Sequence, residues 1–330
     1  MYGVMPKVSV IIPIYGVEKY IERCARSLME QTLTDIEYIF INDCTQDQSI
    51  EILKRVISQY PERQDNIILT NNKTNVGQAR TRRKGIMMAH GDYIIHCDPD
   101  DWVDNDWIKS LYRAASDNNA DISWCGFESI LQDGSRKYFP NRASDSIEDF
   151  LEKLEIGEKW GSMCLHLVRR EIAQSPKIVW PSWNYCEDLA LIFQYAALAQ
   201  SVSYVNRGLY KYRHNTESIT SQRSRKGIIR NVEGEISASL QGLTTCHVLR
   251  LGNRHRSHLF SRIYRAKARL MSAATDATDF CKLWHECSDG LSFTDIWKSS
   301  LGLRIKIVTS LIYLNVYPYV KGKKFNNGNK

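Results

Sequence analysis

The chain has 330 residues, of which 43% are hydrophobic and 25% are charged, a composition typical of an ordinary soluble globular protein. Its length suits one large α/β domain with an appended smaller region. Nine cysteines without a Cys-x-x-Cys pair fit neither a zinc ribbon nor a disulfide framework, so we expect reduced thiols in the cytosol.

The start of the chain and its hydropathy indicate where the protein works. Pro6 and Lys7 lead straight into strand-like residues, so no secretory signal is expected. No stretch reaches the roughly 18 to 20 uncharged apolar residues that cross a bilayer. We therefore expect a cytoplasmic protein, either soluble or peripheral on the inner face of the cytoplasmic membrane.

Charge is distributed unevenly along the chain. Residues 201–330 hold 22 lysines and arginines against 8 acidic residues, whereas residues 1–200 hold 22 against 29. The basic second half suits an anionic surface. Nucleic acid is not an expected partner, since no RNA-binding aromatic motif, zinc finger or helix-turn-helix pattern accompanies the charge.

The first 125 residues alternate short apolar runs with amphipathic segments, which predicts βαβ units around a mostly parallel sheet. Strands are expected at 8–14, 36–41, 66–70 and 93–97, and helices at 18–31, 50–60 and 76–89. Ligands of open α/β sheets bind beyond the carboxyl ends of the strands, so polar residues there should converge on one crevice. These residues are Tyr15, Glu18, Asn42, Asp43, Asn71, Asn72 and the acids of 98–101.

An acidic cluster follows the last of these strands, with Asp98, Asp100 and Asp101 directly after the apolar segment 92–97. An isolated acidic tetrapeptide is more often a solvated turn, but clustered carboxylates at the end of a buried strand suit Mg²⁺ or Mn²⁺. A cation there can hold a diphosphate. Neither common glycine-rich phosphate loop is present, so the metal must neutralise that diphosphate.

A nucleotide in this crevice needs partners for its base and phosphates. Tyr15 could stack on the base, and Asp43 could accept a hydrogen bond from a base N–H. Arg80 could reach either the base or a phosphate. Taken alone, Tyr15 would more often be a packing residue and Arg80 a solvated helix residue.

The ordered set of these segments resembles the family 2 glycosyltransferases of GT-A fold, of the bacterial surface-polysaccharide type. The resemblance covers residues 7 to about 220. Any one segment alone would be weak evidence for the family, whereas the ordered set is strong evidence. The matching segments are 8–15, 41–43, 75–80, 91–94, 98–102, 187–188, and 210–213 with Ser218.

The resemblance implies a Rossmann-like α/β fold for nucleotide-diphospho-sugar transfer, with a mostly parallel sheet. It also implies inverting transfer of a sugar from a nucleotide diphosphate donor, UDP by default, to an acceptor hydroxyl. Pro13, Tyr15 and Asp43 match positions that hold the base, and Arg80 matches an arginine near the base and phosphates. Glu18 joins this donor-binding set.

The resemblance also assigns the acidic cluster, whose Asp98 and Asp100 form the D-x-D of the family. Asp100 is the expected metal ligand, with Asp98 serving ribose and metal geometry and Asp101 in support. Arg213 follows a predicted strand over residues 202–212 and could lie over the diphosphate. His214 is a candidate third metal ligand.

Glu187 and Asp188 match the acidic pair on the acceptor side. Inversion requires a base on the face opposite the leaving diphosphate, so we expect Asp188 to take the acceptor proton with Glu187 in support. Alone, the pair would more often be a helix cap and first-turn acid. It precedes the helical run 189–195, and a helix N-terminus favours a deprotonated carboxylate.

Two domains are expected: a GT-A domain over residues 1–220 and a basic helical region over residues 221–330. The GT-A domain is expected to have a donor half at about 1–125 and an acceptor half at about 126–220. In the latter, helical character runs from about 226 to 274, and an apolar segment covers 305–314. Either this region lies in an anionic membrane interface, or it packs on the catalytic domain. If the region binds a membrane, we expect a lipid-linked oligosaccharide as the acceptor, and otherwise another glycan.

Two other function classes share parts of this pattern. A sugar nucleotidyltransferase also binds Mg²⁺ through carboxylates, but its glycine-rich N-terminal loop is absent at residues 13–16. The other alternative is a scaffold that binds a sugar nucleotide without turnover. The presence of both Asp100 and Asp188 argues against it.

Overall fold

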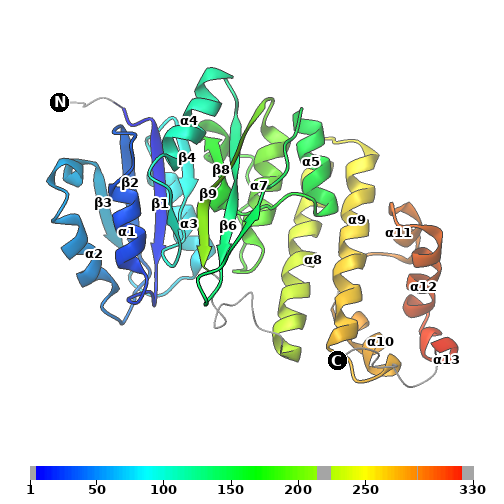
Figure 1. Cartoon of the computed structure of the whole chain (residues 1–330). Helices are drawn as coiled ribbons and strands as arrows, with labels where there is room; N and C mark the ends of the chain where they lie inside the picture. The colour runs from blue at the N-terminus through cyan, green and yellow to red at the C-terminus, as the bar shows by residue number, and fades with distance from the viewer. Residues whose placement is uncertain (1–4, 214–223, 288, 322–330) are drawn as a thin grey trace. The chain divides into compact units, whose positions relative to one another are not determined.

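The computed structural model describes residues 5–213, 224–287 and 289–321, and Figure 1 shows the course of the chain. These residues form two compact units. The first contains residues 5–151, 158–184 and 191–213, and the second contains residues 152–157, 185–190, 224–287 and 289–321. Two short segments that precede residue 220 thus group with the C-terminal helices.

A mixed β-sheet forms the centre of the first unit. Its strands lie in the order β3-β2-β1-β4-β8-β6-β9-β5, and β7 pairs with β6. Strands β1 to β4 are parallel, β8 runs antiparallel to β4 and β6, and β9 runs parallel to β6. The strands are Val8–Ile14 (β1), Ile36–Asn42 (β2), Ile67–Asn71 (β3), Tyr93–His96 (β4), Trp102–Val103 (β5), Ile122–Ile130 (β6), Arg136–Phe139 (β7), His166–Arg169 (β8) and Val202–Arg213 (β9).

The four strands that the sequence predicts in the first 125 residues are confirmed, each to within one residue at its ends. All seven residues of β1 are buried, and β1 pairs with β2 on one side and β4 on the other. A parallel strand covered on both faces requires the continuous apolar run that the sequence shows. The strand expected over residues 202–212 is also present, as β9.

The three predicted helices of this half are confirmed but shorter than expected: α1 (Ile21–Met29), α2 (Ser49–Ile57) and α3 (Gln78–Met88). α1 begins later than predicted because the backbone N–H groups of residues 16–18 bond to side chains of the β2–α2 loop and of Ser49, the first residue of α2. Gly77 precedes α3 with φ of 85°, a backbone conformation that glycine adopts at little cost. The remaining helices of this part are α4 (Trp107–Asp117), α5 (Ile147–Ile156), α6 (Arg170–Ala173) and α7 (Glu187–Leu198), with short 3-10 helices at Pro61–Asn66 (η1) and Met163–Leu165 (η2).

Two buried histidines, His96 of β4 and His166 of β8, line one small cavity of the first unit. Burial lowers the pKa of His166 to about 3. Burial, together with the nearby Arg82, lowers the pKa of His96 well below its usual value. Neither ring nitrogen of His96 has a hydrogen-bond partner within the described ranges. Both rings are therefore neutral in the folded protein at pH 7.

These histidines should make the fold sensitive to acid. An unfolded histidine binds a proton near pH 6.5 and the folded ones do not, so stability falls as the pH drops from 6.5 toward the folded pKa. We expect the free energy of unfolding to fall by up to about 1.4 kcal/mol per histidine for each pH unit below 6. Urea unfolding at pH 7, 6 and 5 measures this slope.

The variant His166→Gln should have a shallower slope, whatever its stability at pH 7. The matched control His247→Gln, at an exposed position of the second unit, should keep the slope of the wild type. An unchanged slope in His166→Gln would contradict the assignment.

Helices alone make up the described C-terminal part of the second unit. They are α8 (Arg225–Val248), α9 (Asn253–Ala268), α10 (Ala277–Glu286), α11 (Phe293–Lys298), α12 (Leu303–Tyr313) and α13 (Tyr317–Lys321), with a 3-10 helix at Arg269–Ser272 (η4). The expected helical character of 226–274 is confirmed, but Arg250, with φ of 56°, lies in a turn that divides it. The unit has its own apolar core, which includes Phe260, Ile263 and Trp284.

The basic residues of α9 and η4 are partly neutralised within the unit. Arg262 and Arg269 both form ion pairs with Glu235 of α8.

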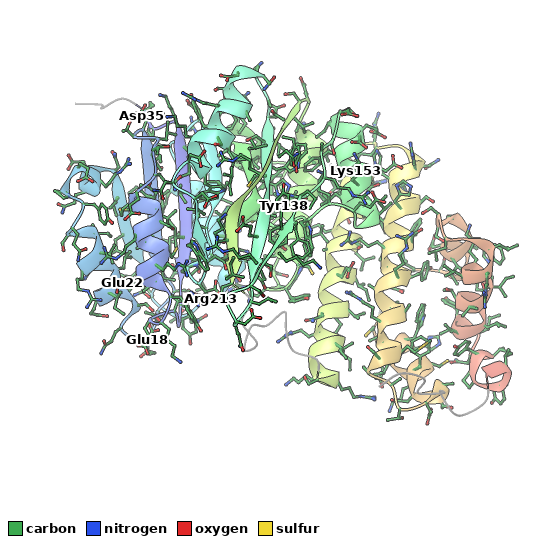
Figure 2. All side chains as sticks on the ribbon, in the orientation of Figure 1. Glu18, Glu22, Asp35, Tyr138, Lys153 and Arg213 are labelled. Carbon is green, nitrogen blue, oxygen red and sulfur yellow. The ribbon has the colours of Figure 1, made fainter. Side chains whose placement is uncertain are left out.

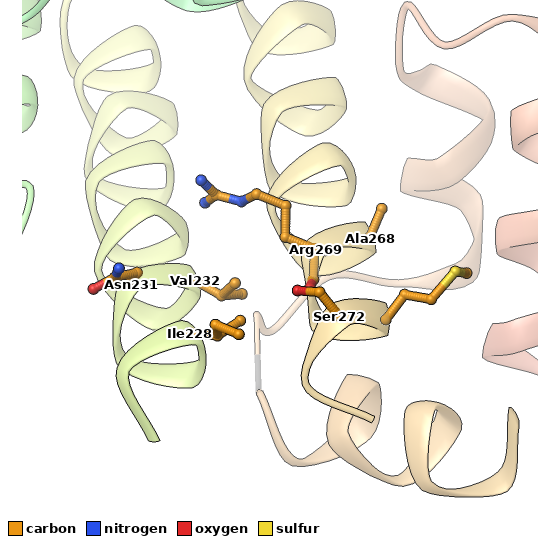
Figure 3. Close-up of a pocket in the computed structure, with 7 residues that line it drawn as sticks. Ile228, Asn231, Val232, Ala268, Arg269 and Ser272 are labelled. Atoms are coloured by element: carbon orange, nitrogen blue, oxygen red, sulfur yellow. The ribbon is translucent and has the colours of Figure 1, made fainter. Parts of the chain in front are cut away.

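Arg269 also borders a pocket of about 510 Å³ between α8 and η4 (Figure 3). The residues that line this pocket are Ile228, Asn231, Val232, Ala268, Arg269, Met271 and Ser272. None of the predicted site residues is among them. No helix in the described ranges is both long enough and apolar enough to cross a bilayer.

Candidate active site

The loop after β1 is fixed by the loop after β2. Gly16 N donates to Thr45 Oγ1 at 2.8 Å, and Glu18 N donates to Asp47 Oδ2 at 2.9 Å. The carboxylate of Glu18 in turn accepts a bond from Gln48 N at 3.2 Å, beside the start of α2. Tyr15 remains 54% exposed at the end of β1. The predicted stacking residue is therefore accessible to a base.

Asp43 organises the loop between β3 and α3. It is 4% exposed, and its carboxylate accepts bonds from Asn72 Nδ2 at 2.8 Å and from Val76 N and Gly77 N at 2.9 Å each. A carboxylate offers about four acceptor positions, so one remains for a ligand. The sequence predicted the ligand role and missed this loop-fixing role.

Asn184, which the sequence gave no role, holds the start of α3. Its Oδ1 accepts a bond from Ala79 N at 3.1 Å, and a Cβ added at Gly77 would lie 2.5 Å from its Nδ2. Gly77 is therefore required both by its backbone conformation and by this close approach. Asn184 lies 105 positions from its partner Ala79, and no local pattern connects the two.

The acidic cluster contacts Arg82, an arginine to which the sequence assigned no role. Arg82 Nη2 lies 2.7 Å from Asp98 Oδ1, and Gln78 Nε2 lies 3.4 Å from the same oxygen. Gln78 and Arg82 stand four residues apart on α3, so they share a face. The predicted Arg80 is exposed. The spacing of Gln78 and Arg82 is the signal that could have identified Arg82.

Substitution of these two arginines by methionine separates their roles. Arg82→Met removes the ion pair to the partly buried Asp98, and we expect it to lower the free energy of unfolding by about 2 to 3 kcal/mol. Arg80→Met changes an exposed side chain, and we expect a change within about 0.5 kcal/mol. Urea unfolding of both variants checks this contrast. Equal losses in the two would contradict it.

Asp101 joins the cluster to the end of β9. It is 2% exposed, Tyr210 donates its hydroxyl to Oδ2 at 2.7 Å, and Arg213 donates its backbone N–H to Oδ1 at 2.7 Å. Burial, with Asp100 and Asp98, raises the pKa of Asp101 well above its usual range. Both oxygens accept bonds from residues of β9, so Asp101 positions the acidic turn against that strand. The supporting metal role that the resemblance implies for Asp101 stays a prediction.

Asp100 has fewer partners at its carboxylate than Asp98 and Asp101 have at theirs. Burial, and then the charge of Asp98, raises its pKa to about 6. No side chain in the described ranges donates a hydrogen bond to it, and Arg213 Nε bonds to its backbone carbonyl at 3.3 Å. A half-buried carboxylate beside a second carboxylate suits a divalent cation. The described residues assemble no group of three or more metal-ligating side chains, and Mg²⁺ commonly binds through one or two carboxylates, with water and phosphate as the other ligands.

The remaining predicted residues lie as follows. Pro13 is buried within β1, and Arg213 ends β9. Figure 2 shows Glu18 and Arg213 at the carboxyl end of the parallel strands and Asp35 at their opposite end. His214, the candidate third metal ligand, lies outside the described residues.

Glu187 and Asp188 begin helix α7, as the sequence predicts, and belong to the second unit. Glu187 is buried, and Asp188 Oδ1 accepts a bond from Leu189 N at 2.8 Å. Cys186 precedes them with φ of 58°. Burial, and then the charge of Asp188, raises the pKa of the Cys186 thiol. Both acids therefore stand in the first turn of a helix, where the helix dipole stabilises negative charge.

The family described as Glycosyl transferase family 2 matches residues 9–174. The chain belongs to this family, which confirms the expected membership of the family 2 glycosyltransferases. Two relatives in Bacillus subtilis (strain 168), EpsH and EpsJ, are 29% and 34% identical to it over 228 residues. These alignments cover 67% and 66% of the chain and 64% and 63% of the relatives, so the chain spans less than two thirds of their length.

Solved structures show the same fold at low sequence identity. S. aureus TarS 1–349 in complex with UDP-GlcNAc matches with a TM-score of 0.66 and 15% identity over 98% of each chain. The mannosyltransferase PcManGT from Pyrobaculum calidifontis, in complex with GDP-Man and Mn²⁺, matches with a TM-score of 0.56 and 14% identity over 96% of this chain and 87% of that one. The expected GT-A fold, with a helical C-terminal region, is confirmed.

Proposed function

We propose that this protein is an inverting, metal-dependent glycosyltransferase that moves a sugar from a nucleotide diphosphate donor to an acceptor hydroxyl. The observation that carries the proposal is Asp100, a half-buried carboxylate without a side-chain donor, beside Asp98 at the carboxyl end of the parallel strands. Membership of family 2 supports it. A UDP-sugar is the proposed donor, and the UDP-GlcNAc bound to TarS supports that choice.

The donor base would lie at the ends of β1 and β2. Pro13 and Tyr15 would border it, and the exposed ring of Tyr15 would stack on it. Asp43 would accept a base N–H at its remaining position while still holding the β3–α3 loop. Arg80 is exposed and would reach the base or a phosphate. Glu18 is fixed at the start of α2 and would border the donor from there.

Asp100 and Asp98 would hold Mn²⁺ or Mg²⁺. Arg82 and Gln78 fix the orientation of Asp98, and Asp101 fixes the turn against β9. The cation, when bound, supplies positive charge to the leaving diphosphate. The guanidinium of Arg213, whose Nε bonds to the backbone of Asp100, would add a second positive charge there.

Asp188 would act as the general base, with Glu187 in support. The acceptor hydroxyl would give its proton to the Asp188 carboxylate as its oxygen bonds to the anomeric carbon. The bond from that carbon to the phosphate oxygen would break, and its electron pair would leave with the diphosphate. Attack opposite the leaving group inverts the configuration of the anomeric carbon.

Binding of the donor tests this proposal. A panel of UDP- and GDP-sugars, each with and without Mn²⁺, is compared by thermal shift, because a ligand that binds the folded state raises its apparent stability. We expect at least one nucleotide sugar to raise the melting temperature only in the presence of Mn²⁺. An equal rise in melting temperature with and without Mn²⁺, or no rise with any donor, would overturn the proposal.

We further propose that residues 1–220 carry out catalysis and that the basic helical region 221–330 contacts an anionic membrane surface, where a lipid-linked acceptor would be presented. The exposed apolar side chains of α12 support this: Leu303 is 66% exposed and Ile307 is 47% exposed, and Arg304 beside them is also exposed. Apolar side chains next to cations suit an anionic lipid interface.

Replacing Leu303 and Ile307 together by serine should weaken binding to anionic liposomes at least about tenfold, because both side chains lose their apolar contact with lipid. Both positions are exposed, so the fold should be unaffected. The control Val248→Ser changes an exposed valine of α8. Equal liposome binding by the double variant and the control would exclude α12 as the contact.

A further inference from the structure

Two arginines lie against Trp102, the first residue of β5. The guanidinium carbon of Arg23, on α1, is 3.3 Å from the centroid of the Trp102 ring, and that of Arg213 is 5.4 Å from it. Arg213 also lies 4.8 Å from the ring centroid of Tyr20. Trp102 is 9% exposed. The indole therefore holds two guanidinium groups in one place through cation–π contacts.

The charges of these two arginines are not matched by ion pairs. In the described part of the chain, no carboxylate forms an ion pair with the side chain of Arg23 or Arg213. Glu22, the neighbour of Arg23 in sequence, lies 2.9 Å from Arg26 and 3.2 Å from Arg55. Asp101 bonds to the backbone of Arg213 and not to its guanidinium.

The positive charge is concentrated enough to affect Arg23 itself. Burial, and then the charges of Arg213 and Arg136, lowers the pKa of Arg23. The charge of Arg213 also opposes the rise in the pKa of Asp100. An anion between the two guanidinium groups would relieve their mutual repulsion.

The chemistry of the pair favours phosphate as that anion. Each guanidinium presents a planar fork of N–H donors that matches phosphate oxygens, and two forks can engage one phosphate. The chain has no glycine-rich phosphate loop, which leaves cationic side chains and the metal to contact phosphate groups. The cation–π contacts with Trp102 fix the arginines before a ligand arrives, which lowers the entropy cost of binding.

We propose that Arg23 and Arg213, held by Trp102, form a single site for a phosphate group of a substrate. This inference rests on the proposed function, because the phosphate would belong to a substrate of sugar transfer. That substrate is either the donor, through its diphosphate, or a phosphate-bearing acceptor. It adds Arg23 and Trp102 to the residues that the transfer reaction uses.

The test compares Arg23→Met and Arg23→Lys with the wild type and with the control Arg55→Met, which changes an exposed arginine of α2. Methionine retains an apolar cover over Trp102, so Arg23→Met should fold. The dissociation constants of UDP with Mn²⁺ and of inorganic phosphate are measured for each protein by titration calorimetry. Loss of one charged hydrogen-bonding group should weaken the ligand of this site by about 10- to 100-fold, with Arg23→Lys affected less.

The two dissociation constants, for UDP with Mn²⁺ and for inorganic phosphate, identify the source of the phosphate. Weaker UDP binding by Arg23→Met, with Arg55→Met unaffected, would assign the site to the donor diphosphate. Weaker phosphate binding with UDP unchanged would assign it to an acceptor phosphate. Unchanged affinity for both, or a wild type that binds neither, would overturn the proposal. A wild type that binds phosphate through Arg23 but no nucleotide would overturn the proposed donor and leave this inference standing.

Discussion

Replacing Asp188 by asparagine is expected to lower the rate of sugar transfer by about 10²- to 10⁴-fold, the usual contribution of a general base. Asparagine has nearly the same shape, and its amide oxygen can still accept the bond from Leu189 N. It cannot take up the acceptor proton. The start of α7 should therefore remain intact while the proton transfer is lost.

Two measurements separate chemistry from binding in this variant. The rate of nucleotide release is measured with the donor identified by thermal shift and with an acceptor, and the donor dissociation constant is measured by titration. The donor constant should equal that of the wild type. Asp117→Asn, an exposed substitution at the end of α4, is the matched control and should keep both values. Transfer by Asp188→Asn at the wild-type rate would show that the base lies elsewhere.

The sequence predicted the parallel half of the fold well, because its signals there are local. A continuous apolar run such as β1 can be covered on both faces, and the acidic cluster directly follows such a strand. The apolar run that precedes Asp98 and Asp100 predicts a buried parallel strand, and the direction of that strand places both acids at the carboxyl end of the sheet. Neither prediction requires knowledge of a distant partner.

The sequence did not predict contacts that join distant segments. Tyr210 bonds to Asp101 across 109 positions, and Asn184 bonds to Ala79 across 105. Which residue of α3 contacts Asp98 depends on how that helix is rotated about its axis against the sheet, and in the structure that residue is Arg82. Periodicity predicts that a helix has a buried face, but it does not give the side chain opposite a given carboxylate.

In the basic region, too, the sequence did not predict which charged side chains contact each other. Counting residues identifies a cationic half, which includes Arg262 and Arg269, but it does not show whether these charges are paired. In the structure Glu235, on the preceding helix α8, pairs with both. The exposed apolar residues of α12 were found only from the fold, because burial depends on how the helices of the unit pack.

Replacing Asp100 by asparagine is expected to have opposite effects on the metal-free protein and on donor binding. At pH 7 the folded protein holds Asp100 ionised, although burial and Asp98 raise its pKa to about 6. A raised folded pKa means that the ionised group opposes folding at pH 7. Removing the charge should therefore stabilise the metal-free protein by up to about 3 kcal/mol.

The same substitution should remove the main ligand for the cation. We expect the Mn²⁺-dependent affinity for UDP to fall at least about 100-fold, since even residues that only orient metal ligands contribute 10- to 100-fold. Thermal shift in EDTA, and then with Mn²⁺ and UDP, measures both effects on one sample. Asp117→Asn again serves as the control.

The two effects together distinguish a ligand of a cation from a residue that only maintains the turn. If Asp100 were structural, as Asp101 is through its bonds to Tyr210 and Arg213, its replacement would lower the melting temperature in EDTA as well as in the presence of ligand. A higher melting temperature in EDTA, combined with loss of the UDP response, would mean that the charge is retained for binding at a cost in stability. A UDP response equal to that of the wild type would exclude Asp100 from the metal site.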